Sequence, residues 1–278
     1  MITFQHLLTR ETTDRYLEVL HIPKARADLA YLKTLIKAHL HTIPYENFSK
    51  YHFAEDHLER DSFLPDTDEF LWNFIEKGWG GTCYPLNIHF SRLLRSLGFE
   101  CSLVRVHSGH IGIKVQYGGN DYYVDVGYGC PLFQPLPLAD HDMIKFRKLG
   151  EEIYIRKISE STFEIDRHSD GKSFVQKEID WSSRSEDEFS KEINISHQDR
   201  NENTVMRRLN ATIFKPRYCY YVNNDTITRK NAYMKEVSRF SNRHDWARRI
   251  YHIFGIEEKI ALKAAAYLED RGIQLFKV

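Results

Sequence analysis

The sequence has few cysteines, no long apolar run and no excess of charge of either sign. Its four cysteines, Cys83, Cys101, Cys130 and Cys219, stand far apart without a CxxC pair, which argues against a disulfide framework and a structural zinc site. No apolar stretch reaches the roughly 18 residues of a membrane span, and the N-terminal segment contains no signal-peptide core. We therefore expect a cytoplasmic protein that binds neither a metal nor a membrane.

The balance of charge also limits the partners. Lysine and arginine together number 39, as do aspartate and glutamate, so the formal net charge is zero and attraction to nucleic acid is not expected. Hydrophobic residues make up 42% and charged residues 28% of the 278 positions, as in ordinary globular proteins. This length allows one large domain or two to three smaller ones, and the sequence does not indicate an oligomeric state.

The first part of the chain has the apolar spacing of helices. Apolar residues recur every three or four positions in 26–40 and 68–76, which predicts helices with one buried face. A third apolar stripe begins just after Cys83 and ends at Gly98, a residue type that commonly follows a helix C-terminus.

The pattern then changes to strands. Alternating β-branched and aromatic residues predict strands at 102–106, 111–117 and 122–126, and Gly118–Asp121 between the last two is a hairpin-turn signal. Further strands are expected at 153–158, 163–167 and 174–179.

The tail is mixed. Residues 182–203 are polar and acidic and are expected to form surface loops, and a final helix is expected near 259–268. Helices first, strands second and a mixed tail predict an α+β fold.

Cys83 is the best candidate for a reactive residue. It lies in the segment GWGGTCYPLN, after two glycines and at the start of a predicted helix, whose first turn is marked by Pro85. A thiol at this place meets free N–H groups and the positive end of the helix dipole, and both favour the nucleophilic thiolate. Most single cysteines are simply small buried residues, and that is the interpretation we favour for the other three.

A thiolate nucleophile usually works with a histidine and a third group that orients it. His110 begins one predicted hairpin strand and Asp125 lies in the other, and with an even-length turn both side chains share one face. His107 is the competing base, but it has the opposite strand parity. An acidic residue inside an apolar strand is costly to bury without a partner, so Asp125 is the more informative of the pair.

The register of this hairpin is open. A turn centred on Gly119 and Asn120 places Asp125 opposite Lys114, whereas direct opposition to His110 needs an earlier turn or a bulge.

Three separated segments resemble the signature segments of arylamine N-acetyltransferases. They are IPYENF at 43–48, GGTCYPLN at 80–87 and YVDVGYG at 123–129, and a PLPL segment follows at 135–138. The order of cysteine, histidine and aspartate also matches. The resemblance is clear over the first half of the chain and general over the rest.

The resemblance implies a fold and its division. It implies an N-terminal helical bundle with the nucleophile at 1–98, a β-barrel-like domain with His110 and Asp125 at 99–200, and an α/β lid at 201–278. The catalytic core would be similar to that of cysteine proteases.

The resemblance also implies a ping-pong reaction and a pocket. Cys83 would take the acetyl group of acetyl-CoA, with no metal, and an arylamine or arylhydrazine would receive it with His110 handling its proton, as in xenobiotic metabolism. Tyr45 and Tyr128 match residues that line the acceptor pocket of the family, and their hydroxyls would make this pocket more polar.

Two positions depart from the family pattern. Trp79 replaces an arginine that pairs with the glutamate of the first motif, here Glu46, and Pro85 is atypical. Because an unpaired buried carboxylate is costly, either another cation serves Glu46 or the loop is rebuilt.

Other interpretations remain open. The rivals are a cysteine hydrolase or transglutaminase-like enzyme, and a catalytically idle binding homologue. The CoA phosphates would need cations, but such charge runs are more often solvated surface, so the densest basic group is not assigned as a site. Its members are Arg207, Arg208, Lys215 and Arg217.

Overall fold

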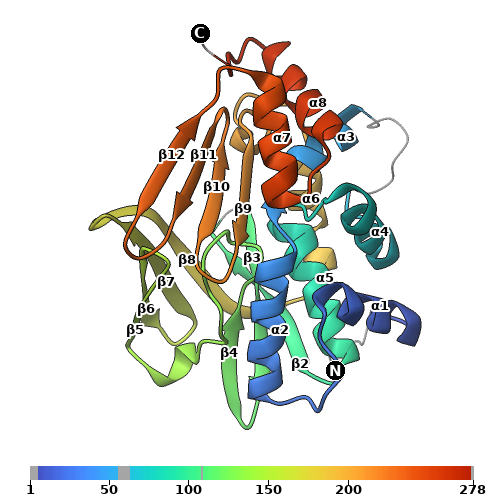
Figure 1. The fold of residues 1–278 in the computed structure, drawn as a ribbon. Helices are drawn as coiled ribbons and strands as arrows, with labels where there is room; N and C mark the ends of the chain where they lie inside the picture. The colour runs from blue at the N-terminus through green and yellow to red at the C-terminus, as the bar shows by residue number, and fades with distance from the viewer. Residues whose placement is uncertain (1–5, 56–62, 108, 277–278) are drawn as a thin grey trace.

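The computed structural model describes residues 6–55, 63–107 and 109–276. Helices dominate its first part (Figure 1). Side chains of Thr9, Asp28 and Asp66 cap three of these helices by accepting hydrogen bonds from backbone N–H groups in the first turn. The helices are α1 (Arg10–Leu20), α2 (Leu29–Thr42), α3 (Phe48–Glu55), α4 (Thr67–Lys77) and α5 (Cys83–Ser96).

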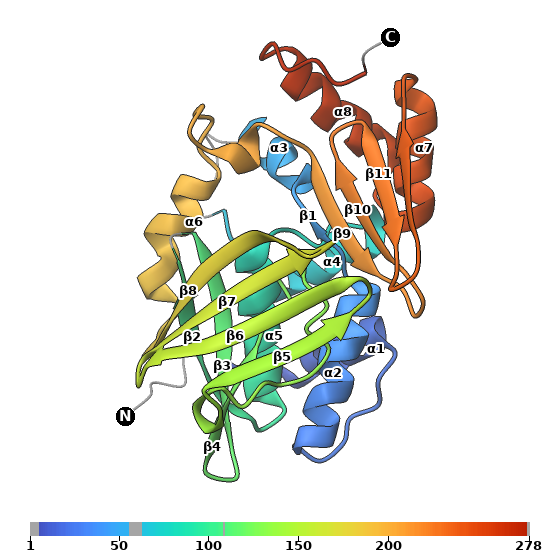
Figure 2. The ribbon, with the colours of Figure 1, turned by 90° about the vertical axis from the view of Figure 1, so that its left-hand side faces the viewer.

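A seven-stranded antiparallel sheet follows, and it curls around the side of α5 (Figure 2). Its strand order is β4-β3-β2-β8-β7-β6-β5, so the two hairpin sets meet through the pairing of β2 with β8. Helix α5 packs against β2 and β3. The strands are β2 (Glu100–Val106), β3 (His110–Tyr117), β4 (Asn120–Val124), β5 (Met143–Lys148), β6 (Glu151–Ser159), β7 (Thr162–Ser169) and β8 (Lys172–Arg184).

A second sheet joins one short strand of the N-terminal part to the strands of the C-terminal part. The short strand β1 (Tyr45–Glu46) pairs with β9 (Asn210–Phe214), with Tyr45 opposite Thr212. The sheet continues through the C-terminal strands, and the last two helices lie beside it (Figure 1). These elements are β10 (Cys219–Asn223), β11 (Thr226–Lys230), β12 (Lys235–Arg239), α7 (Arg243–Phe254) and α8 (Glu258–Glu269).

Two apolar cores meet near the end of β4. Val124 and Val126 belong to the larger core, which includes the helices and the second sheet. Tyr123 and Tyr128 belong to the smaller core inside the curled sheet. Because neighbouring residues of this segment enter different cores, Asp125 lies at the boundary between them.

The structure confirms the mixed α+β class and most of the predicted elements. Helices α2, α4, α5 and α8 and the predicted strands up to β8 appear within a few residues of their expected bounds. The loop prediction for 182–203 was wrong, because β8 runs on to Arg184 and helix α6 (Ser190–Ser196) follows. The polar sequence misled because α6 buries little besides Ile193. In the described part of the chain, no helix is both long and apolar enough to cross a membrane.

Candidate active site

Cys83 is the first residue of α5 and is 8% exposed. Gly81 just before it has a φ of 90°, a left-handed conformation that favours glycine and turns the chain into the helix. The Thr82 side chain makes no capping hydrogen bond, so it does not occupy the N–H groups of the first helical turn. Cys83 Sγ lies 3.6 Å from the Gly109 carbonyl oxygen.

His110 and Asp125 meet directly. His110 Nε2 lies 2.7 Å from Asp125 Oδ2, and the two residues are 4% and 1% exposed. Asp125 immediately follows β4, and His110 is the first residue of β3. His107, the competing base, is exposed. The structure therefore brings together the histidine and aspartate that the sequence singled out.

The register of the hairpin matches neither alternative considered from the sequence. Tyr117 pairs with Asn120, so the turn consists of Gly118 and Gly119. The turn is even, as expected, and both side chains share a face. His110 and Asp125 are diagonal rather than opposite, and their side chains span that diagonal.

Several donors hold the Asp125 carboxylate. Asn87 Nδ2 donates to Oδ1 over 2.9 Å, the Gly127 N–H donates to Oδ1 over 2.9 Å, and the Tyr123 hydroxyl donates to Oδ2 over 2.7 Å. Asn87 lies one turn after Cys83 on α5, and its Oδ1 also accepts the Val126 N–H at 3.0 Å. The nucleophile's helix is thus tied to the aspartate. Sequence reasoning missed Asn87 and Tyr123; the i, i+4 spacing from Cys83 was the signal for Asn87.

The electrostatics favour a thiolate beside an imidazolium. Burial alone would raise the pKa of Cys83, but the charge of His110 and its hydrogen bond to the thiol outweigh burial and lower it. Burial opposes the charged form of His110, yet Asp125 and Cys83 raise the pKa of the ring to about 9. Burial likewise disfavours ionised Asp125, and His110 more than compensates, so its pKa is lowered.

The other three cysteines differ from Cys83. Burial raises the pKa of Cys101 to about 12 and of Cys219 to about 11, and it also raises the pKa of Cys130. These thiols stay protonated and packed, so their surroundings set them apart from Cys83.

Glu46 is fully buried but is not left without partners, although Trp79 stands where the sequence resemblance implies an arginine. Its carboxylate accepts from the Ser49 N–H at 2.9 Å, the Ser49 hydroxyl at 2.8 Å and the Gly81 N–H at 2.7 Å. Burial still raises the pKa of Glu46, despite these donors. Backbone and hydroxyl donors therefore replace a direct ion pair, and they tie the loop before Cys83 to α3.

Lys50 is a buried cation that sequence reasoning missed. Its ammonium group donates to the Ser196 hydroxyl at 2.9 Å and to the Ser196 carbonyl at 3.3 Å, at the end of α6. Burial lowers its pKa to about 7, while Cys83 and Glu46 favour its charge. Lys50 also lowers the pKa of Cys83, after His110, as does Lys177 from β8.

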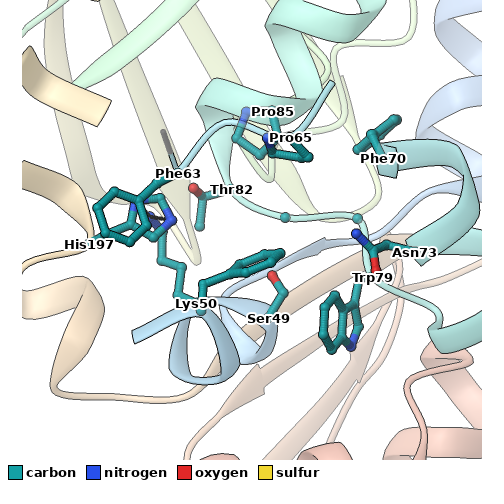
Figure 3. Close-up of a pocket in the computed structure, with 13 residues that line it drawn as sticks. Ser49, Lys50, Phe63, Pro65, Phe70, Asn73, Trp79, Thr82, Pro85 and His197 are labelled. Atoms are coloured by element: carbon teal, nitrogen blue, oxygen red, sulfur yellow. Dashed lines mark hydrogen bonds between the residues drawn. The ribbon is translucent and has the colours of Figure 1, made fainter. Parts of the chain in front are cut away.

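A small cavity of about 30 Å³ lies behind the Cys83 loop. Figure 3 shows Lys50, Trp79 and Asn73 around it, with Phe63 against His197. The indole of Trp79 packs against Phe53, with the ring centroids 5.4 Å apart. The Lys77 ammonium also lies over the Trp79 ring, 4.2 Å from a ring centroid, so Trp79 makes aromatic and cation–π contacts at this position.

The two predicted pocket tyrosines come from different segments, Tyr45 from β1 and Tyr128 from the loop after β4. The ring of Tyr128 lies against that of His110, with centroids 4.7 Å apart. Its hydroxyl is buried and neither donates nor accepts a hydrogen bond among the described residues. Arg167 holds this segment by donating to the carbonyls of Tyr128 and Gly129 at 3.2 and 2.9 Å. Tyr45 is half-buried on β1, and burial and the charge of Cys83 raise its pKa.

A family model described as N-acetyltransferase matches residues 28–262. The chain belongs to the arylamine N-acetyltransferase family. Proansamycin X synthase of Amycolatopsis mediterranei is 32% identical over 124 residues, which cover 40% of this chain and 46% of that protein. Arylamine N-acetyltransferase 1 of Oryctolagus cuniculus is 25% identical over 157 residues, or 49% of this chain and 52% of that protein. The chain thus spans about half the length of these curated relatives.

Solved structures of arylamine N-acetyltransferases share the fold. The enzyme of Salmonella typhimurium has a TM-score of 0.78 at 19% identity and covers 94% of this chain and 99% of its own. The fold of the family therefore extends over nearly the whole of this chain. Within the described residues, no group of three or more His, Cys, Asp or Glu side chains is placed to hold a metal ion.

Proposed function

We propose that the protein is an acetyl-CoA-dependent N-acetyltransferase that carries the acetyl group on Cys83 and passes it to an arylamine or arylhydrazine. The observation that supports this most directly is the buried alignment of Cys83, His110 and Asp125. It combines a lowered thiol pKa, a 2.7 Å contact from His110 Nε2 to Asp125 Oδ2, and a helix start at the nucleophile. Family membership indicates the classes of donor and acceptor.

In the first half-reaction, the Cys83 thiolate attacks the thioester carbonyl carbon of acetyl-CoA. The carbonyl oxygen becomes an oxyanion that the N–H groups at the start of α5 stabilise. Collapse of this intermediate breaks the bond to the sulfur of CoA, which leaves with the proton of His110. The products are acetyl-Cys83, CoA and a neutral His110.

In the second half-reaction, the amine nitrogen attacks the carbonyl carbon of acetyl-Cys83. Neutral His110 takes a proton from the nitrogen, and the sulfur of Cys83 leaves as a thiolate. Asp125 keeps the ring oriented and stabilises the imidazolium that forms. The cycle returns to the ion pair with which it began.

Tyr45 and Tyr128 line the acceptor pocket in this proposal. The contact of Tyr128 with His110 and the electrostatic link of Tyr45 to Cys83 support it. Their hydroxyls make the pocket more polar, so acceptors with hydrogen-bonding substituents are favoured. If Tyr45→Phe and Tyr128→Phe leave the order of preference among substituted arylamines unchanged, this assignment is wrong.

We further infer three functional parts. A helical part at 1–98 supplies the nucleophile, a β-rich part at 99–200 supplies His110 and Asp125, and 201–278 forms a lid. The triad then forms between the first two parts, as in a cysteine-protease-like core. A thiolate nucleophile favours a reducing compartment, so we place the reaction, an acetylation of xenobiotic amines, in the cytoplasm.

Intact-protein mass after brief exposure to acetyl-CoA tests the proposal. The wild type should gain one acetyl group, Cys83→Ala none, and the control Cys101→Ala one, because Cys101 is buried with a raised pKa. Adding an arylhydrazine should remove the adduct and yield acetylated product. Hydrolysis without transfer would indicate a hydrolase, and an unreactive Cys83 would indicate an idle binding homologue.

A further inference from the structure

One oxygen of Asp125 accepts two hydrogen bonds. Oδ2 lies 2.7 Å from His110 Nε2 and 2.7 Å from the hydroxyl oxygen of Tyr123. Tyr123 is 0% exposed, and burial followed by the charge of Asp125 raises its pKa well above the usual range. Its hydroxyl is therefore a permanent donor, and it shares the carboxylate oxygen on which the ring of His110 depends.

Strand geometry accounts for the placement of this hydroxyl. Tyr123 is two residues before Asp125, so both side chains project from the same face. The Tyr123 ring lies in the smaller core, with Trp181 at a centroid distance of 6.3 Å. It has no access to solvent and so none to a diffusing substrate.

Gly112 on β3 provides the space for the ring. A Cβ at Gly112 would lie 2.4 Å from Tyr123 Cε2 and 3.0 Å from the hydroxyl oxygen, closer than real Cβ contacts. The φ of Gly112 is not positive, so its backbone does not require glycine. Glycine weakens the interior of a strand, and the close approach of Tyr123 explains its presence here.

We propose that Tyr123, with the clearance at Gly112, is a positioning residue that sets the strength of the hydrogen bond between His110 and Asp125. The phenol draws charge from Oδ2 and fixes the orientation of the carboxylate, while Asn87 and Gly127 occupy Oδ1. Tyr123 thereby limits how strongly Asp125 holds the imidazolium. This limit helps His110 to become neutral, as it must to accept a proton from the amine.

The proposal rests on the proposed function for its role in turnover, but its electrostatic part does not. Removing the phenol hydroxyl concentrates charge on Oδ2 and stabilises the imidazolium. His110 is already protonated where Cys83 ionises, so the pH at which the ion pair forms does not fall, whereas neutral His110 appears only at higher pH. The pKa of His110 is therefore the quantity that reports the effect of the phenol.

Other titratable groups lie around the site and set the absolute pKa of His110. They are the same in the wild type and in a Tyr123 variant, so they do not account for the shift between the two proteins. These groups are Cys83 on α5, Lys50 on α3, Lys177 on β8 and the neutral Tyr128, with Arg167 of β7 over the Tyr128 ring.

The test compares Tyr123→Phe with the wild type and with Tyr122→Phe. Tyr122 is the next residue of β4, is partly exposed and has the opposite strand parity, so it is a matched control. The first measurement is the pKa of the His110 ring from an NMR titration, with each variant in a Cys83→Ala background, which needs no acetyl transfer. We expect this pKa to rise by about half a unit to one unit in Tyr123→Phe and to stay in Tyr122→Phe.

The second measurement is the discharge of acetyl-Cys83 to an arylhydrazine against pH. Its ascending limb should move to higher pH in Tyr123→Phe, with the KM for acetyl-CoA unchanged. An unchanged or lowered His110 pKa would overturn the proposal, because a merely structural tyrosine leaves it in place or loosens the contact of His110 with Asp125. A wild type that is alkylated normally but never acetylated would contradict the proposed function alone.

A second variant covers the case in which Tyr123→Phe does not fold. Gly112→Ala keeps the phenol but crowds its ring, and the same rise in the His110 pKa is expected. A folded Gly112→Ala protein with the wild-type His110 pKa, in the same Cys83→Ala background, would contradict the proposal.

Discussion

Glu46 and Asp125 are two buried carboxylates near Cys83 that respond to burial in opposite ways. Both accept backbone N–H and side-chain donors, at distances of 2.7 to 2.9 Å. Burial raises the pKa of Glu46, whereas the charge of His110 overcomes burial and lowers that of Asp125. Neutral donors thus offset only part of the effect of burial on the pKa of a carboxylate, whereas a directly bonded cation reverses the direction of the pKa shift.

The largest effect is expected from a variant that removes the charge of Asp125. Asp125→Asn keeps the shape but removes the charge that stabilises the imidazolium of His110. We expect the kcat/KM of acetyl transfer to fall by about 10³- to 10⁴-fold, as in related triads. The same variant should show a raised pH midpoint for Cys83 alkylation. A variant that retains a tenth of wild-type kcat/KM would mean that His110 needs no charged partner.

The pH dependence of the free energy of unfolding tests how far Asp125 raises the pKa of His110. The pKa of His110 is raised to about 9, so folding retains a proton that the unfolded chain loses at lower pH. This stabilisation is complete below the ordinary histidine pKa and is lost as pH rises toward about 9. The lowered pKa of Cys83 acts in the opposite sense, so the measurement uses Cys83→Ala.

In Cys83→Ala, Asp125 still raises the His110 pKa but Cys83 no longer contributes, so the free energy of unfolding should fall by about 1–2 kcal/mol as pH rises above the ordinary histidine pKa. Cys83→Ala/Asp125→Asn serves as the matched control and should lose most of this slope, because the charge that raises the His110 pKa is gone. Equal slopes in the two proteins, from urea unfolding at several pH values, would contradict the assignment of the shift to Asp125.

A change at Glu46 should affect the free energy of unfolding more than the acidity of Cys83. Glu46→Gln keeps one acceptor oxygen and replaces the other, which bonds to Ser49 or Gly81, with an amide NH₂ donor. We expect a loss of about 1–3 kcal/mol in the free energy of unfolding, with an alkylation midpoint close to that of the wild type. A midpoint shift as large as that of Asp125→Asn would show that Glu46 acts on the thiol directly.

The smallest effect is expected at Lys50. Its pKa is about 7, so it is charged mainly below neutral pH, where its charge favours the Cys83 thiolate. Lys50→Met should raise the alkylation midpoint by a few tenths of a unit, and Lys177→Met on the other side is the companion variant. If neither changes the midpoint, His110 alone sets the acidity of the thiol.

The fold was predictable where one local rule dominated. Apolar spacing predicted α2, α4 and α5, the final helix α8 was also expected, and alternation predicted every strand of the curled sheet except β5. The helix α6 was missed because it is short and buries few of its residues, so its sequence has no apolar stripe. Strand β1 has only two residues, and its pairing with β9 depends on contacts between distant parts of the chain.

The candidate residues of the site follow from short-range rules on backbone conformation and strand parity: a cysteine at a helix start, a histidine at a strand start, and an aspartate that shares its face. The remaining features come from the folded chain, because register and burial depend on contacts between distant segments. These contacts set the diagonal of His110 and Asp125, satisfied Glu46 without an arginine, and placed the buried Tyr123 hydroxyl on Asp125.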